Sequence, residues 1–392
     1  MHACLFRRWA MPWRETNAMK QRKEFVEKLL SRRWTMTELC QRYGVSRVTG
    51  NKWWKRFKEC GYPGLKELSR APRSCPHRTK REIEEALVAA RKQYPKWGPV
   101  TLLEVVQREH SDWKLPAPST AGEIFKRNDL IKPRKRRARP RHPGRPYVEM
   151  TCPNDVWGAD FKGEFKTKDG RYCYPLTVTD GCSRFLLGCK SLRSTEHEGA
   201  KVEFERIFRA HGLPHQILTD NGVPFASQAL CGLSRLSVWW IKLGIHPIRI
   251  EPGKPSQNGR HERMHKTLKD EAVYPPEKNA EKQQRRFNEF RERFNNVRPH
   301  HALGKKTPAE VYQPSPRAFP KKLGELEYPD DFTVRKVHGN GCMIWHQKHI
   351  FVSHVLIDER VGLEPLLEGL WSVYLGPMLL ARFDEREGRI YS

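Results

Sequence analysis

Apolar residues recur at helical spacing in the first part of the chain. Over residues 20–30 they return every three or four positions, which predicts an amphipathic helix. The following stretch, TMTELCQRYGVSRVTGNKWWKRF, predicts two short helices, the first capped by Thr35 or Thr37 and the second by Ser46. Gly44 stands between them, where a tight turn favours a positive φ. This order of elements is typical of a helix-turn-helix.

The start of the second of these helices is the candidate DNA-reading surface. In a helix-turn-helix this part of the helix faces the major groove. The residues there are Arg47, Thr49, Gly50, Asn51 and Lys52. A plain αα-hairpin is the alternative, and the basic composition favours DNA binding.

A second group of helices is predicted over residues 77–131, and it resembles another helix-turn-helix unit. It is followed by KPRKRRARPRHPGRP, which has eight Lys or Arg and four Pro among fifteen residues. Such a run cannot bury a core, so residues 132–147 are predicted to be a linker. Its charge predicts contacts with phosphates, unless it is a solvated spacer that contacts nothing. The predicted phosphate contacts are Arg134, Lys135, Arg136 and Arg137.

The pattern changes after residue 148. Short alternating or apolar runs, separated by Asp-Gly turns, are followed by alternating helices and strands up to residue 314, which predicts a mixed sheet with helices on its faces. Residues 328–392 contain several further β-like runs, such as WSVYLG and MLLARF, and predict a small all-β, barrel-like domain. The expected organisation is therefore an all-α helix-turn-helix domain at 18–70, a second helical domain, a linker, an α/β core and a small β domain.

The charge of the chain is unevenly distributed. The formal net charge is +28, of which residues 1–150 carry +21 and the other 242 residues carry +7. A basic first part favours a polyanion, above all nucleic acid, as partner; a ribosome-associated or merely soluble basic protein is the alternative. No run of about 18 apolar residues predicts a membrane span. The ten cysteines form no CxxC pair, which favours reduced thiols in a cytosol over a zinc ribbon or disulfides.

Three carboxylates stand out in the α/β segment. Asp160 lies near the end of its first strand, Asp220 follows an apolar strand in ILTDNG, and Glu262 lies early on a helix. Residues at strand ends and at a helix start can meet at one edge of a sheet, and such oxygen ligands suit Mg²⁺. Two ions could activate a nucleophile and stabilise a leaving oxygen. Each acid alone is more typical of a turn or of a surface Glu–Lys pair. Lys266 and Lys269 share the helix face of Glu262, so metal and phosphate could bind together.

The motifs NDVWGADFKGEF, LTDNGVPFAS, PGKPSQNGRHERMHKTLKDE and FNNVRPHHALGKKTPAEVY resemble those of an integrase-core transposase of bacterial insertion sequences, a family related to retroviral integrases. The resemblance covers essentially the whole chain, and the motifs occur in the family's order. It implies an RNase-H-like sheet, with Asp160 on the first strand and Asp220 after the fourth. It also implies that the catalytic, metal-binding set is Asp160, Asp220 and Glu262, with Asn258 and Lys269 at the family's spacing from the glutamate.

The resemblance also implies a function. A member of this family binds the terminal inverted repeats of its element, cuts the ends with Mg²⁺ or Mn²⁺, using two ions, and joins the freed 3′-hydroxyls to target DNA. Such an enzyme acts on double-stranded DNA in the bacterial cytoplasm at the nucleoid. Because two ends are joined in one event, a dimer or larger homo-oligomer is expected. A catalytically inactive relative acting as a sequence-specific regulator is the alternative.

One spacing departs from the family pattern. The family has about 35 residues between the second Asp and the Glu, whereas 41 lie between Asp220 and Glu262, and we expect the extra residues in a longer helical connection around SQALCGLSRLSVWWIKLG. Glu251 and Glu271 are rival third ligands that lack the Asn and Lys context.

The segment His261-Glu262-Arg263-Met264-His265 also matches the H-E-x-x-H zinc-protease motif, but the extended continuation is absent. We therefore interpret His261 and His265 as DNA-facing or metal-flanking residues.

Overall fold

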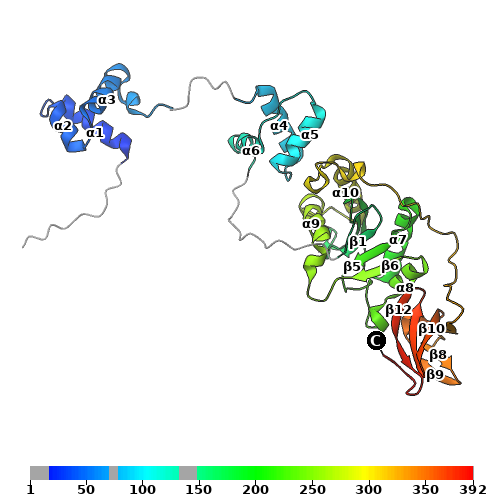
Figure 1. Ribbon diagram of the computed structural model, residues 1–392. Helices are drawn as coiled ribbons and strands as arrows, with labels where there is room; N and C mark the ends of the chain where they lie inside the picture. Colours follow the sequence, from blue (N-terminus) through cyan, green and yellow to red (C-terminus); the bar gives the residue numbers. More distant parts are fainter. Residues whose placement is uncertain (1–16, 70–77, 132–147, 392) are drawn as a thin grey trace, which may run out of the picture. The chain divides into compact units, whose positions relative to one another are not determined.

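The structure is a computed structural model that describes residues 17–69, 78–131 and 148–391 (Figure 1). Its contacts divide the chain at residue 78 into two compact units. The first unit contains three helices, and the second contains three further helices, a mixed sheet with its helices and a smaller antiparallel sheet. Within the described residues, no helix is long and apolar enough to cross a membrane.

The first unit is a three-helix bundle. Its helices are α1 (Ala18–Leu30), α2 (Met36–Tyr43) and α3 (Arg47–Cys60), followed by a 3₁₀ turn at Tyr62–Leu65. Thr35 caps α2, Gly44 ends it with a φ of 63°, and Ser46 caps α3. The predicted helices, their caps and the glycine turn are therefore confirmed.

The second unit begins with another three-helix group around its own apolar core. The helices are α4 (Arg81–Gln93), α5 (Pro99–Glu109) and α6 (Pro118–Arg127). Both α5 and α6 begin with a proline, which fits the first turn because no carbonyl there needs its missing N–H group.

A mixed sheet forms the centre of the second unit. Its strand order is β2-β3-β1-β5-β6, with β4 paired to β3; β1 is antiparallel to β3 and parallel to β5. This confirms the predicted mixed sheet. The strands are β1 (Val156–Phe161), β2 (Phe165–Lys166), β3 (Tyr172–Asp180), β4 (Leu186–Leu192), β5 (Gln216–Thr219) and β6 (His246–Arg249).

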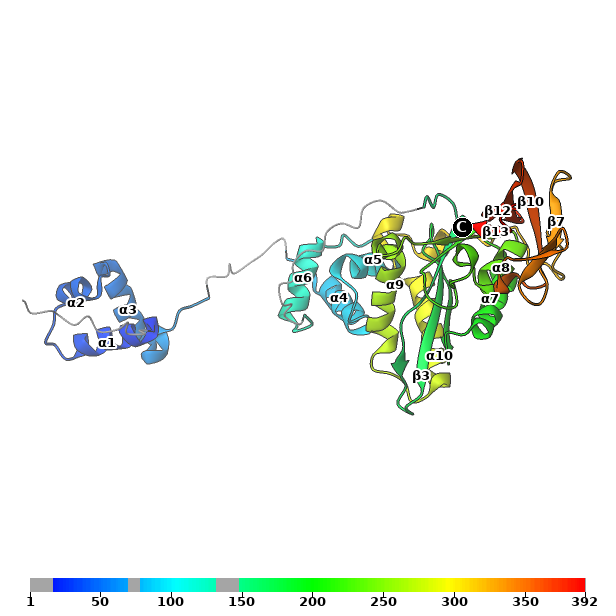
Figure 2. The same ribbon diagram turned by 90° about the horizontal axis from the view of Figure 1, so that it is seen from below.

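Helices cover both faces of this sheet (Figure 2). Apolar side chains of α7 (His197–His211) and α8 (Arg235–Lys242) pack on one face, and those of α9 (Gly259–Leu268) and α10 (Ala280–Glu292) pack on the other. Both α9 and α10 continue into a π-helical turn, and four short 3₁₀ turns complete this part. These segments are Lys269–Val273, Arg293–Val297, Leu230–Gly232, Pro255–Asn258, His301–Leu303 and Pro308–Glu310.

The helix predicted over LCGLSRLSVWWIKLG is shorter than expected. Residue Cys231 has a φ of 52°, which breaks the helical run, and α8 begins only after Ser234, whose hydroxyl accepts a hydrogen bond from the amide of Ser237. A local polar cap therefore decides where this helix starts.

The last part of the chain is an open antiparallel sheet of order β13-β12-β11-β10-β7, with a separate β8–β9 hairpin. The prediction of a barrel-like domain is wrong on this point, because β7 and β13 each pair with one strand and do not close the sheet on each other. The elements are β7 (Thr333–Lys336), β8 (Cys342–Trp345), β9 (Lys348–Phe351), a 3₁₀ turn at His354–Leu356, β10 (Arg360–Leu367), β11 (Leu370–Leu375), β12 (Met378–Asp384) and β13 (Arg389–Tyr391).

Gly50 tests how tightly the first unit is packed. A Cβ atom at Gly50 would lie 2.6 Å from the Cys40 sulfur and 2.9 Å from the Met36 sulfur, so Gly50→Ala should destabilise α1–α3 by about 1–3 kcal/mol. Gly122→Ala in α6 is the matched control, because its Cβ would meet only Pro99 at 3.9 Å and should stabilise that helix by about 0.5–1 kcal/mol. Peptide-resolved amide hydrogen exchange of the full chain measures both effects. Equal protection of α1–α3 in the wild type and Gly50→Ala would contradict this packing.

Candidate active site

Two of the three predicted acids lie at one edge of the mixed sheet. Asp160 is the fifth residue of β1, and Asp220 follows the last residue of β5. The parallel register joins Val156 to Gln216 and Gly158 to Leu218, so the same offset places Asp160 level with Asp220. The amide of Gly222 donates to Oδ1 of Asp220 at 3.0 Å and fixes that side chain in its turn. With the two-residue β2 set aside, Asp220 follows the fourth strand, as the resemblance implied.

The pKa of Asp160 depends on its burial and on the charges of the other two acids. Burial is the main reason why the pKa of Asp160 rises to about 7, and the negative charges of Asp220 and Glu262 raise it further. Glu262 is exposed in the first turn of α9. The charges of the other two acids thus act on Asp160, a buried carboxylate that resists ionisation. A bound cation would remove this repulsion.

The rival acids are engaged elsewhere. Glu271 accepts hydrogen bonds from Arg298 at 2.7 Å and from the indole of Trp97 at 3.0 Å. Glu251 accepts from Gln257 at 2.7 Å and forms an ion pair with Lys254. The acids that chiefly raise the pKa of Asp160 are Asp220 and Glu262 and neither of these two glutamates.

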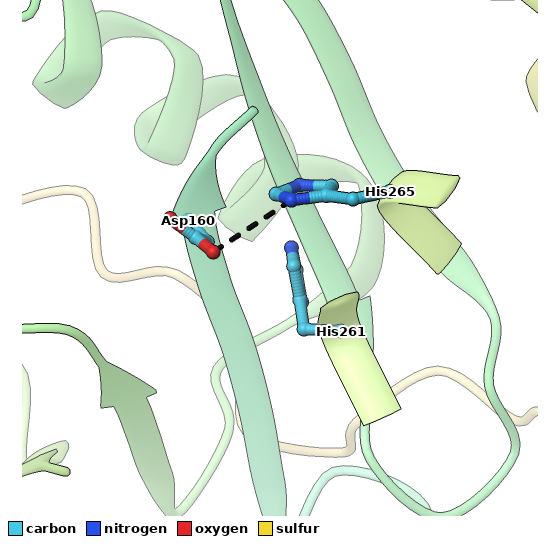
Figure 3. A group of neighbouring side chains, drawn as sticks. All are labelled: Asp160, His261 and His265. Atoms are coloured by element: carbon cyan, nitrogen blue, oxygen red, sulfur yellow. Dashed lines mark ion pairs between the residues drawn. The ribbon is translucent and has the colours of Figure 1, made fainter. Parts of the chain in front are cut away.

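The two histidines of the H-E-x-x-H segment point into the protein (Figure 3). Nε2 of His261 and Nε2 of His265 each lie 2.7 Å from the hydroxyl of Thr177, and Nδ1 of His261 lies 2.9 Å from the hydroxyl of Thr179. Burial lowers the pKa of His261 to about 3 and that of His265 to about 2, so both are neutral. The interpretation of these residues as DNA-facing is therefore wrong, because the i, i+4 spacing turns both rings toward β3.

The hydrogen bonds assign the histidine tautomers. Thr177 donates its hydroxyl proton to the carbonyl oxygen of Asp160 at 3.0 Å, so both Nε2 atoms must donate to Thr177. Nδ1 of His261 then accepts from Thr179. Nδ1 of His265 keeps its lone pair and lies 3.7 Å from Oδ2 of Asp160, beyond hydrogen-bond distance.

Asp160, His261 and His265 form a group whose potential ligand atoms lie within 4.8 Å of one another. Both nitrogens of His261 are occupied by threonine hydroxyls, so in this group Asp160 and Nδ1 of His265 are the atoms open to a cation. This pairing does not provide the two histidine ligands of a zinc-protease site, because both ring nitrogens of His261 lie against threonine hydroxyls.

Gly158 leaves room for this network. A Cβ atom at that position would lie 3.0 Å from Nδ1 of His261 and 3.4 Å from the hydroxyl of Thr179. The sequence reasoning missed Thr177 and Thr179. Their i, i+2 spacing on one face of a strand, combined with two histidines at i, i+4 on a helix, is the signal that could have found them.

The predicted DNA contacts near the acids differ in exposure. Asn258 is buried, and its amide lies 3.4 Å from Oδ2 of Asp160, so it supports that carboxylate from within. Lys266 and Lys269 are exposed, and the ammonium of Lys269 lies 5.6 Å from the ring centre of Tyr274.

In the first unit, Arg47, Asn51 and Lys52 are exposed at the start of α3, and Thr49 is half-buried. Gly50 is buried against α1 and α2 and does not face outward, which corrects the expectation for that residue. The four basic residues Arg134, Lys135, Arg136 and Arg137 lie outside the described residues.

Comparison with known proteins defines the class. Two family models described as "Integrase core domain" match residues 150–255 and 243–308, and one described as "Homeodomain-like domain" matches residues 49–125. The chain therefore carries an integrase core domain together with a helix-turn-helix DNA-binding region, and its homologues are insertion-element proteins and retroviral polyproteins.

An insertion element IS476 protein of 39.2 kDa from Xanthomonas euvesicatoria is 30% identical over 46% of this chain and 51% of the relative. The Gag-Pol polyprotein of baboon endogenous virus is 30% identical over 41% of this chain and 9% of the polyprotein. The chain thus spans about half the length of the insertion-element relative. The HTLV-2 integrase catalytic core domain, solved in complex with magnesium, is 18% identical, with a TM-score of 0.31 over 41% of this chain and 98% of that domain.

The hydroxyl of Thr177 should contribute more to the free energy of unfolding than an ordinary surface hydroxyl does. Thr177→Val keeps the shape but leaves two buried Nε2–H groups without their partner, so the free energy of unfolding should fall by about 1–3 kcal/mol. Thr267→Val is the control: its hydroxyl bonds only the carbonyl of Arg263, and a change within about 0.5 kcal/mol is expected. Urea unfolding measures both. A Thr177→Val protein as stable as the control would refute the network.

Asp160 should make folding stability depend on pH. Its pKa is about 7 in the folded state and 3.8 as the reference value, so ionisation favours unfolding as the pH rises from about 4 to 7, by up to about 4 kcal/mol. Asp160→Asn removes this cost. The variant should match the wild type near pH 4, exceed it increasingly up to pH 7, and keep a constant advantage above that. Added Mg²⁺ at pH 8 should stabilise the wild type more than the variant. Thermal melts over pH 4–8 measure this, and a difference that does not vary with pH is the contrary result.

Proposed function

We propose that this protein is a DNA transposase that binds the terminal inverted repeats of an insertion sequence and catalyses strand cleavage and strand transfer. The observation that carries the proposal is the position of Asp160 on an integrase core, level with Asp220 on the neighbouring strand, where burial above all, and then the charges of Asp220 and Glu262, raise the pKa of Asp160 to about 7. A carboxylate whose pKa is raised in this way, with other carboxylates near it, is typical of a functional site.

The three acids fit Mg²⁺ or Mn²⁺, and in this proposal Asp160, Asp220 and Glu262 hold two ions. Hard oxygen ligands and an uncompensated negative charge are what such cations select. When bound, the ions would activate the attacking oxygen and neutralise charge on the leaving oxygen of a phosphodiester.

The protein's own residues position this set. Thr177 holds the backbone of Asp160, Asn258 lies beside its carboxylate, and Gly222 holds Asp220 in its turn. Glu262 is exposed on α9 and can reach a substrate without rearrangement of the core. In this proposal Lys266 and Lys269, on the same helix face, contact the phosphates beside the cut.

Recognition of the element ends is assigned to the helical units. In this proposal Arg47, Thr49, Asn51 and Lys52 at the start of α3 read base edges in the major groove. The basic segment containing Arg134, Lys135, Arg136 and Arg137 adds salt-dependent affinity for the backbone. Joining two ends in one event requires at least a dimer on DNA, acting in the bacterial cytoplasm.

The test is a Mg²⁺-dependent cleavage and strand-transfer assay on duplex DNA from both flanks of the gene. Wild type should release 3′-ends and join them to target DNA, whereas Glu262→Gln should bind the same DNA and lose both reactions by about 100-fold or more, because a metal ligand is removed. Glu289→Gln, another exposed glutamate on a helix of the core, is the control and should react as the wild type does.

Two outcomes separate the alternatives. If all three proteins bind the DNA and none cuts it, the chain is a DNA-binding regulator and the catalytic proposal fails. If Glu262→Gln cuts as well as the wild type, Glu262 is not the third ligand.

A further inference from the structure

A second charged feature lies on the same helix as Glu262. A hollow of about 260 Å³ is lined by residues of the β3–β4 turn, α9 and the segment after α10. Four of the lining residues are arginines, two are histidines, and Asp180 is the single acid among them. The hollow therefore concentrates positive charge in a partly enclosed space.

The arginines of this hollow repel one another. Burial lowers the pKa of Arg184 to about 10, and the charges of Arg260 and Arg263 lower it further. Burial also lowers the pKa of Arg260 and of Arg298. The charged arginines that line one hollow therefore form a local cluster of positive charge.

The acid in the hollow attracts Arg184 but forms its hydrogen bonds with other groups. Both carboxylate oxygens of Asp180 are used, one by the amide of Asn154 at 2.8 Å and the other by the amide and hydroxyl of Ser183 at 2.7 and 2.6 Å. The guanidinium groups of Arg184 and Arg263 form no hydrogen bond or ion pair with any described residue. Their donors are therefore available to a ligand.

Three other groups that line the hollow are Arg298, Arg260 and His300. Arg298 is paired with Glu271, and Arg260 donates to the carbonyl of Gly181 at 2.9 Å. Nε2 of His300 is buried without a hydrogen-bond partner among the described residues.

We propose that this hollow binds a phosphate group of the DNA backbone, with Arg184 and Arg263 as its principal contacts. Guanidinium groups match phosphate oxygens in pairs, and a desolvated site strengthens the interaction. Asp180 pairs with Trp157, three residues before Asp160 on β1, which places the hollow about 10 Å from the acids along the strand.

This inference rests on the proposed function for the identity of the nucleic acid, and it adds a backbone contact to it. The hollow would fix the register of the DNA relative to the acids without reading sequence, because phosphate contacts carry no base information.

The test uses the full chain and a fluorescently labelled duplex from the element end, with binding measured by anisotropy over a series of NaCl concentrations. Arg184→Gln and Arg263→Gln should each reduce the slope of log affinity against log salt by about 0.9, because one phosphate contact is lost. The same reduction should occur on a shuffled duplex. Arg193→Gln, an exposed arginine that does not line the hollow, is the control and should keep the wild-type slope.

Unchanged slopes in both variants overturn the proposal. Arg263 is exposed, so its variant decides the matter if Arg184→Gln unfolds. Melting in inorganic phosphate is the second arm: if phosphate stabilises the wild type but not the variants while the slopes stay equal, the site takes a free ion and the DNA contact is wrong. These binding and melting measurements do not depend on strand cleavage. A negative result here can therefore be told apart from a negative result of the cleavage assay that tests the proposed function.

Discussion

The Thr177 hydroxyl connects the three elements on which the candidate active site depends. It donates to the backbone of Asp160 on β1 and receives hydrogen bonds from two histidines of α9, while Thr177 itself belongs to β3. Because one oxygen atom satisfies three groups, the helix cannot rotate or slide against the sheet without leaving buried donors unpaired. The position of Glu262 relative to Asp160 is thus set by neutral hydrogen bonds beneath the acids, and the charges themselves need not hold the site together.

The helix α9 divides its residues among three faces. One face is buried against the sheet and carries both histidines, Met264 and Leu268. A second carries Glu262 with Lys266 at i+4, and a third carries Arg260 and Arg263 toward the hollow. Arg260 and Arg263 are therefore kept on a different side of this ten-residue helix from Glu262. In this arrangement a cation and a backbone phosphate can be bound next to each other without the acids and arginines neutralising one another.

Local signals explain which parts could be predicted from the sequence. The caps at Ser46 and Thr35 and the turn at Gly44 are set by neighbouring residues, so the first unit followed from its pattern. The fold class followed from strand and helix periodicity. The orientation of His261 did not, because it depends on Thr177, more than 80 residues earlier in the chain. The open edges of the last sheet and the Arg184 cluster likewise arise from pairing between distant segments, which a single sequence does not encode locally.

The longer spacing between Asp220 and Glu262 has a structural use. We expect the extra length between β5 and β6, where Leu233, Val238 and Ile241 pack into the same apolar cluster as strands of the last sheet. After this detour β6 returns parallel to β5, with Gln216 opposite His246, so the chain re-enters the sheet in register. The distance between the two acids is then determined by strand pairing and by the Thr177 contacts of α9. An insertion at this point can therefore bind the β domain to the core and leave the position of Glu262 unchanged, because loop length adds little cost once the flanking strands are paired.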